Sequence, residues 1–233
     1  MVTAFNVGTI LGSASASFFA ERLGRRLSMM GLGNLGVISA ALAMAAAKPM
    51  DSFGLLISGR VLGGYFTGLQ YVMLALYLTE ISRPQQRGFN ASFQNLMVSV
   101  NGLLSMAMAL PHLLGRDEAW IPLNALPVPF AILQIALLPF FPETPKFLYL
   151  KRHNPQKAKE AFLFFNPDAS EAEILETFTH YEAEAKLDQK QNSMGLLAAL
   201  GKRHLRNPLL LSILVAMASI SSGITVIFGF STG

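Results

Sequence analysis

Acidic and basic side chains stand next to one another at three places in this 233-residue chain. They are Glu21 with Arg22, Arg25 and Arg26, Glu80 with Arg83 and Arg87, and Glu143 with Lys146. Exposed ion pairs of this type contribute only about 0–1 kcal/mol each. A network of them beside a region of low dielectric constant is different, because each charge there depends on its partner. Such a network can hold the ends of several helices together in one conformation and release them in another.

Residue types that usually carry catalysis or bind metals show no functional spacing. The chain has no cysteine, which excludes disulfides, thiol catalysis and cysteine-ligated metals. The histidines have no metal-ligand spacing; they are His112, His153, His180 and His204. Gly31-x-Gly33-x-x-Gly36 matches a dinucleotide fingerprint, but it follows a basic loop, not a strand, so close helix packing explains it better. The sequence therefore predicts no enzyme, no metal site and no cofactor.

Composition indicates the elements that must position the charges. Hydrophobic residues make up 52% of the chain and charged residues 14%, where soluble domains carry about 25% charged residues. A helix that spans a bilayer needs about 20 mostly apolar residues. Six stretches qualify: Val2–Ala20, Leu27–Ala47, Phe53–Thr79, Ala91–Leu113, Trp120–Phe141 and Pro208–Thr232. The sequence thus predicts an all-α membrane protein with six transmembrane helices, in contact with lipid and not with nucleic acid.

The basic residues predict how these helices are oriented. All but three of the 18 Lys and Arg side chains lie in the first, third and fifth gaps between the stretches; the exceptions are Lys48, Arg60 and Arg116. Positively charged loops stay on the cytosolic side of a membrane. We therefore expect the N-terminus outside, and the long polar segment Pro142–Asn207 in the cytosol.

The polar segment Pro142–Asn207 carries two helix-start signals. Asn154 precedes Pro155, which is typical of an N-cap followed by proline at the first helical position. Ser170 and Glu173 have the spacing of a capping box. A solvated linker and a small helical bundle packed under the membrane helices both fit this composition. The two agreeing caps favour the bundle, with a third short helix after Ser193.

The third apolar stretch contains an intramembrane arginine beside closely spaced glycines. Gly59, Gly63, Gly64 and Gly68 form two Gly-x-x-x-Gly pairs, which allow helix backbones to approach closely. Arg60 lies among them. Its side chain can extend outward to the membrane surface or face a water-filled path, and the sequence does not separate these readings.

Several short motifs occur in an order that resembles one transporter family. They are Glu21-Arg22-Leu23-Gly24-Arg25-Arg26, Gly59-Arg60-x-x-Gly63-Gly64, Tyr77-x-x-Glu80 followed by Arg87-Gly88, Pro142-Glu143-Thr144-Pro145-Lys146 and Ser222-Gly223-Ile224. In this order they resemble the sugar-porter branch of the major facilitator superfamily, the facilitative glucose transporter-like proteins. The resemblance extends over essentially the whole chain.

The resemblance implies a partial major facilitator fold. Residues 1–141 would form five membrane helices, equivalent to helices two to six of the N-terminal half. Residues 142–207 would form the cytosolic helical linker, and residues 208–233 the first helix of the C-terminal half. The charges predict that the N-terminus lies outside, and this is the orientation that the first stretch would have as helix two of that fold.

The resemblance also implies which residues act. Asn95 stands at the sugar-binding glutamine of helix five, and Ser219 and Thr225 stand at polar positions of helix seven. The charges of the cytosolic gate would be Glu21, Arg25, Arg26, Glu80, Arg87, Glu143 and Lys146. Ile220 replaces a second polar residue of helix seven, and Ala75 replaces a proline before Tyr77.

The expected function is transmembrane transport of a small polar solute, a sugar such as a hexose, by alternating access. The chain would act as part of a longer one, as a multi-pass protein of the plasma membrane. The alternative is a non-transporting membrane protein: a truncated or regulatory form, or an incomplete gene model. The sequence does not indicate the solute, ion coupling or oligomeric state.

Overall fold

The computed structural model of the protein describes residues 2–110, 112–114, 116, 120–191, 210, 211 and 214. Throughout these residues the secondary structure is helical, with no strand. The chain divides into two compact units, residues 1–178 and residues 179–233. The first unit holds helices α1 to α8 and the start of α9. The predicted short helix after Ser193 and nearly all of the sixth stretch lie outside the described residues.

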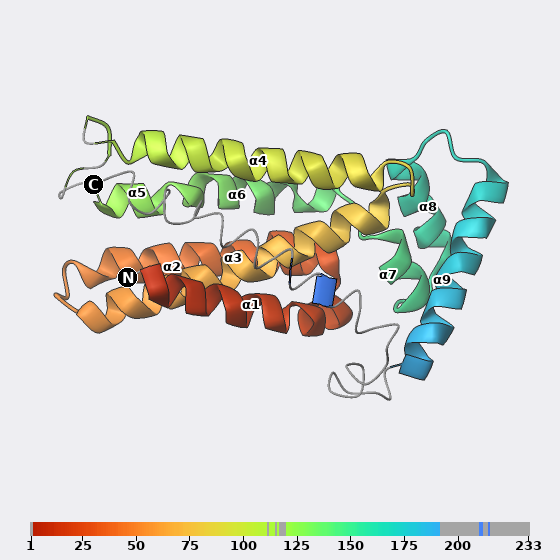
Figure 1. The fold of residues 1–233 in the computed structure, drawn as a ribbon, viewed down its shortest axis with the longest axis horizontal. Helices are drawn as coiled ribbons and strands as arrows, with labels where there is room; N and C mark the ends of the chain where they lie inside the picture. The colour runs from red at the N-terminus through yellow and green to blue at the C-terminus, as the bar shows by residue number, and fades with distance from the viewer. Residues whose placement is uncertain are drawn as a thin grey trace. The chain divides into compact units, whose positions relative to one another are not determined.

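Three long helical segments lie side by side in the first unit (Figure 1). They are α1 (Val2–Leu23), the π-helix η1 (Leu27–Gly33) continued by α2 (Asn34–Ala47), and α3 (Phe53–Ile81). Within the part of the chain that is described, Leu27–Ala47, Phe53–Ile81 and Ile121–Phe140 are long and apolar enough to cross a membrane. These three segments confirm the second, third and fifth predicted stretches.

Helices α1 and α3 touch through their backbones along a line of glycines, the glycine seam, formed by Gly8, Gly12, Gly64 and Gly68. A Cβ atom on Gly12 would lie 1.8 Å from the carbonyl oxygen of Tyr65, and one on Gly68 would lie 2.2 Å from that of Thr9. No larger residue fits there, because both neighbours are backbone atoms. The predicted role of Gly64 and Gly68 in close helix packing is confirmed.

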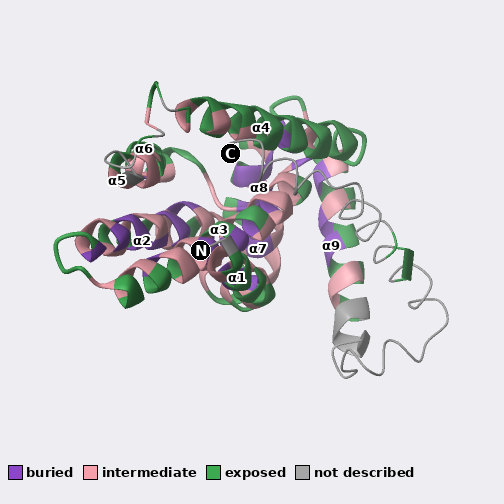
Figure 2. Cartoon of the chain, turned by 60° about the vertical axis from the view of Figure 1, so that its left-hand side comes forward, coloured by how far each residue is buried: buried purple, intermediate pink, exposed green. Residues whose placement is uncertain are grey.

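The next helices are more open. Helix α4 (Arg87–Met108) shows mostly exposed residues (Figure 2), and Gln94 is its buried residue. Helix α5 (Trp120–Ala125) is followed by α6 (Pro127–Leu137) and the 3-10 turn η2 (Leu138–Phe140). The interruption falls at Leu126 because Pro127 has no backbone N–H to continue α5.

Three more helices follow the apolar ones. They are α7 (Pro145–Leu150), α8 (Pro155–Phe165) and α9 (Glu171–Gln191). Both predicted helix starts are confirmed: Asn154 accepts a hydrogen bond from the N–H of Lys157 at 3.0 Å, and Ser170 accepts one from Glu173 at 3.2 Å. The Asn166 amide, just after α8, donates to the carbonyl of Ile81 at 3.4 Å. Asn166 therefore connects this part of the polar segment to the end of α3.

Candidate functional site

A half-buried ion pair joins the turn after α1 to the end of α3. Arg25 donates to Glu80 Oε1 from Nη2 at 2.8 Å and from Nε at 3.1 Å. The two side chains are only 13% and 9% exposed. Arg25 also donates from Nη1 to the carbonyl of Ala20 at 3.1 Å. Because water reaches neither charge freely, each carries a desolvation cost that the other offsets.

Thr144 forms a hydrogen bond with the second carboxylate oxygen of Glu80. Its hydroxyl donates to Glu80 Oε2 at 2.6 Å. Thr144 Oγ1 also accepts a hydrogen bond from the N–H of Phe147 at 3.4 Å, and this bond caps α7. Thr144 is fully buried. One threonine therefore starts α7 and ties it to the acidic residue at the end of α3.

The side-chain carboxylate of Glu143 binds backbone N–H groups of the turn between α1 and η1. Glu143 Oε1 accepts hydrogen bonds from the backbone N–H groups of Arg25 at 3.1 Å, Arg26 at 3.0 Å and Thr144 at 3.0 Å. The turn depends on Gly24, whose φ of +91° favours glycine. A Cβ there would also lie 2.3 Å from Glu143 Oε2. A larger residue at position 24 would thus displace the carboxylate.

Two more contacts complete this group, which we call the charge junction: Arg25, Arg26, Tyr77, Glu80, Glu143 and Thr144. Tyr77 donates from its hydroxyl to the carbonyl of Pro142 at 2.9 Å. Arg26 donates from Nη1 to the carbonyl of Phe141 at 2.5 Å. The junction therefore connects three segments that are distant in the sequence: the turn at 24–26, the end of α3 and residues 141–144.

The structure brings some of the predicted gate residues together and not others. Arg25, Arg26, Glu80 and Glu143 meet in the junction. Glu21 instead pairs with Lys151 at 3.3 Å on the exposed surface. Arg87 is exposed, and its side chain makes no ion pair with any residue in the described part of the chain. Lys146 is half-buried on α7.

Sequence reasoning omitted Thr144 and Tyr77 from the gate, although both lie in motifs that it singled out. A threonine directly before Pro145 is a helix-start signal, and this signal could have identified Thr144. Nothing local indicates that Tyr77 reaches Pro142, because that contact joins residues 65 positions apart.

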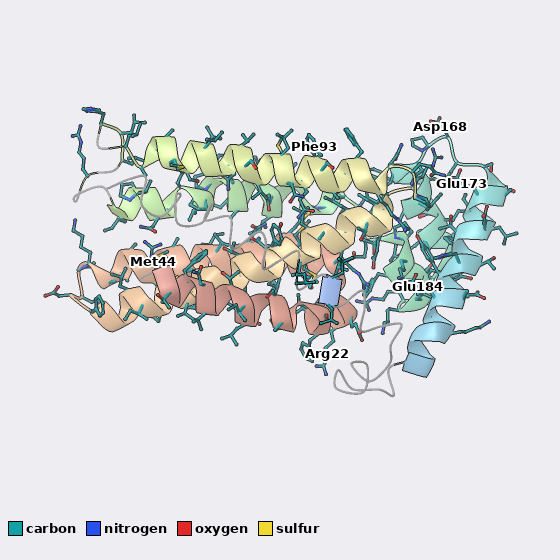
Figure 3. All side chains as sticks on the ribbon, viewed as in Figure 1. Arg22, Met44, Phe93, Asp168, Glu173 and Glu184 are labelled. Carbon is teal, nitrogen blue, oxygen red and sulfur yellow. The ribbon has the colours of Figure 1, made fainter. Side chains whose placement is uncertain are left out.

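Two flanking arginines lie at the edge of the junction. Arg22 projects from the end of α1 (Figure 3) and stacks on Phe18, with its guanidinium carbon 4.2 Å from the ring centre. Arg83 pairs with Glu173 of α9 at 2.8 Å between Nε and Oε1.

A separate pair joins α8 to α9. Lys159 donates a hydrogen bond to Glu171 at 2.7 Å, and this bond, together with the positive charge of Lys159, holds the pKa of Glu171 below its ordinary value.

Of the three predicted solute-contacting residues, the structure describes Asn95. Asn95 is exposed on α4, next to the buried Gln94. Ser219 and Thr225 lie outside the described residues.

A cavity of about 530 Å³ lies toward the other end of the helices, where Figure 3 labels Met44. Its lining includes Arg60, Thr67, Ser105 and Asn124 among mostly apolar residues. The Nε atom of Arg60 is buried and has no hydrogen-bond partner among the residues described. Arg60 thus borders a partly open cavity. In the described part of the chain, no group of three or more His, Asp or Glu residues could hold a metal ion.

Comparisons with known proteins agree over the whole chain. The family model described as "Sugar (and other) transporter" matches residues 1–233. The chain is 33% identical over 234 residues to solute carrier family 2, facilitated glucose transporter member 3, of Rattus norvegicus, and 33% identical to the Homo sapiens protein of that name. Each match includes 100% of this chain and 46% of the relative. The chain thus spans about half the length of the curated relatives it matches.

Solved structures show the same fold. The inward-open conformation of the xylose transporter XylE from E. coli aligns with a TM-score of 0.71 and 17% identity, over 99% of this chain and 52% of that one. The structure of the proton:xylose symporter XylE bound to 6-bromo-6-deoxy-D-glucose aligns with a TM-score of 0.63 and 19% identity, over 82% of this chain and 44% of that one. The partial major facilitator fold predicted from the sequence is confirmed.

Proposed function

This chain belongs to the sugar (and other) transporter family, and from that premise we propose that it forms part of a protein that carries a sugar across a membrane. The observation that supports this most directly is the family match over residues 1–233. The relatives it matches are named as glucose transporters and not as enzymes.

We propose further that transport proceeds by alternating access, with the charge junction as a gate. All six of its residues contribute side chains that bond to another of the three segments: Arg25, Arg26, Tyr77, Glu80, Glu143 and Thr144. Parting the segments would break these bonds together. A conformation in which they stay closed would therefore be favoured until solute binding elsewhere supplies a compensating free energy.

For the solute site we propose Asn95, Ser219 and Thr225. Asn95 lies on α4, the most open helix of the first unit, and its amide is exposed. Removing an amide that bonds a sugar hydroxyl leaves that hydroxyl without a partner, which costs about 1–3 kcal/mol. A hexose is the solute we expect first, because glucose appears in the names of the relatives.

The proposed location is the plasma membrane, with residues 142–207 in the cytosol and the N-terminus outside. A chain without cysteine makes this testable. Lys157→Cys should react with an impermeant maleimide only after cells are permeabilised, and Asp117→Cys should react in intact cells. Labelling of Lys157→Cys from outside would contradict the proposed orientation.

Transport itself can be tested by expressing the complete reading frame in cells that lack hexose uptake, and by measuring the entry of radiolabelled glucose and xylose. We expect saturable uptake of at least one sugar. Glu80→Gln should reduce the maximal uptake rate, whereas Arg87→Gln, at an exposed position that forms no ion pair with the described residues, should not. Asn95→Ala should raise the sugar concentration needed for half-maximal uptake.

The outcomes separate the parts of the proposal. Absence of sugar uptake, with the protein present at the cell surface, would contradict the transport function. Uptake that is equal in Glu80→Gln and Arg87→Gln would contradict the gate alone. Unchanged kinetics in Asn95→Ala would remove that residue from the solute site.

A further inference from the structure

Three amide side chains meet between the apolar helices, away from the charge junction. Asn34 of α2 donates from Nδ2 to Gln134 Oε1 of α6 at 2.9 Å. Gln70 of α3 donates from Nε2 to Asn34 Oδ1 at 2.8 Å. Asn34 is only 3% exposed. These residues, which we call the amide clasp, therefore link three helices by side-chain hydrogen bonds at a depth where polar groups are costly unless paired.

The clasp also binds the π-helical segment η1. Gln70 donates to the carbonyl of Met29 at 3.2 Å, and Asn34 donates to the carbonyl of Met30 at 2.9 Å. π-Helices are rare, and a π-turn holds one residue more than an α-turn. Gly33, at the end of η1, leaves room for the Gln70 side chain, since a Cβ there would lie 2.4 Å from Gln70 Cγ.

Both sides of η1 are fixed by contacts that require a particular helix rotation. Just before it, the N–H groups of Arg25 and Arg26 bind Glu143. Just after it, Gly36 receives the ring of Phe66, and a Cβ on Gly63 would lie 3.6 Å from that of Ala40. Each residue of an α-helix turns the chain by about 100°. If η1 became α-helical at the same length, one of the two sets of contacts would be lost.

We propose that Asn34, Gln70 and Gln134 are positioning residues that select the π-helical register of Leu27–Gly33. Packing at Gly36 and Gly63 also favours this register, but dispersion contacts are not directional. The amides are directional: they are paired with one another and with the carbonyls of Met29 and Met30 in this register. A buried polar residue fixes the register of coiled coils in the same way, at some cost in stability. By this device, the clasp keeps Arg25 aligned with Glu80 while α2 stays packed on α3.

Disulfide formation can report the register directly, and without any transport measurement. Ala40→Cys with Gly63→Cys places two Cβ atoms about 3.6 Å apart, within the usual disulfide range of about 3.5–4.5 Å. Ser39→Cys with Gly63→Cys is the matched pair: Ser39 is exposed in this register and would take the place of Ala40 if η1 became α-helical. No native cysteine interferes. The rates would be measured in membranes with copper phenanthroline.

In the parent we expect the Ala40 pair to cross-link much faster than the Ser39 pair. The variant Asn34→Leu, Gln70→Met, Gln134→Met removes all three amides together, so none of them is left without a partner by the loss of another. It should lower the ratio of the two rates on the order of tenfold, the size expected when two interhelical amide bonds are lost. An unchanged ratio would overturn the proposal. Gln134→Met alone, at the exposed end of the clasp, should shift the ratio in the same direction by less.

A deletion provides the decisive control. Removing Gly31 from the triple variant leaves an α-helix with one residue fewer, which has the same rotation at both ends as the original π-helix. Fast cross-linking at Ala40 should then return. A clasp that only stabilised the protein would give no such rescue, because the deletion restores no hydrogen bond. Failure of the rescue would therefore also contradict register selection.

Discussion

The glycine seam and the charge junction hold α1 and its neighbours to α3 by different means. In the seam, backbone lies on backbone and the contact depends on the absence of side chains, as at Gly12 and Gly68. In the junction, long side chains bridge the segments, as Arg25 does to Glu80. A seam of this kind leaves the helices no room for larger groups. A junction of side chains can separate while every helix stays intact.

This difference indicates where the protein can move and where it cannot. Van der Waals contact falls off steeply with distance, so α1 and α3 should move as one body. Ion pairs and hydrogen bonds can exchange their partners for water when a crevice opens. We therefore expect substitutions in the seam to cost more stability than substitutions in the junction. The following substitutions test that division.

The largest effect should come from the seam. Gly12→Leu places a side chain where the carbonyl of Tyr65 lies, and we expect it to destabilise the protein by about 3 kcal/mol or more. Gly54→Ala is the matched control, because nothing lies within 4 Å of its added Cβ; it should stabilise by about 0.5–1 kcal/mol. Melting temperatures in detergent would measure both. Similar melting temperatures for the two variants would show that α1 and α3 are not in close contact.

The ion pair of the junction should come next. Glu80→Gln leaves the half-buried Arg25 without a countercharge, and we expect a loss of about 3 kcal/mol. Arg25→Gln should cost a similar amount, and the double variant less than the sum of the two singles. Arg87→Gln serves as the exposed control, with a change within about 0.5 kcal/mol. Additive losses at Arg25 and Glu80 in thermal unfolding would mean that the two charges do not depend on each other.

A smaller effect is expected at Thr144. Thr144→Val removes both the hydrogen bond to Glu80 and the cap of α7, and should cost about 1–2 kcal/mol. Thr144→Ser keeps the hydroxyl and should stay near the parent. Hydrogen exchange of the α7 amides would localise the change. Equal protection of the α7 amides in Thr144→Val and Thr144→Ser would show that the Thr144 hydroxyl does not link α7 to Glu80.

The smallest effect is a pH dependence outside the junction. Lys159 holds the pKa of Glu171 below its ordinary value, so the pair contributes stability above that ordinary value and loses it as the pH falls through the lowered pKa. Lys159→Ala should return the pKa of Glu171 to its ordinary range. Carboxyl ¹³C NMR of labelled protein would follow it, and Lys157→Ala serves as the control. If the pKa of Glu171 is unchanged in Lys159→Ala, Lys159 is not the cause of its lowering.

Local signals in the sequence determined much of the fold. Length and hydropathy set the apolar helices Leu27–Ala47 and Phe53–Ile81, and caps at Asn154 and Ser170 set the starts of α8 and α9. These features depend on a few neighbouring residues, because capping and helix length are decided within one or two turns. The motif order further indicated the family, since each motif is recognisable by itself.

The partners of each charge were decided only by the tertiary structure. The sequence placed Glu80 and Arg87 on one short turn, but Glu80 turned out to pair with Arg25 and Thr144, which are 55 and 64 positions away. The amide clasp and the π-helix gave no local signal. A polar residue in an apolar stretch has the same sequence pattern whether or not its side chain finds a hydrogen-bond partner. A hydrogen bond depends on where two helices cross and how each is rotated, and those quantities come from packing of the whole unit.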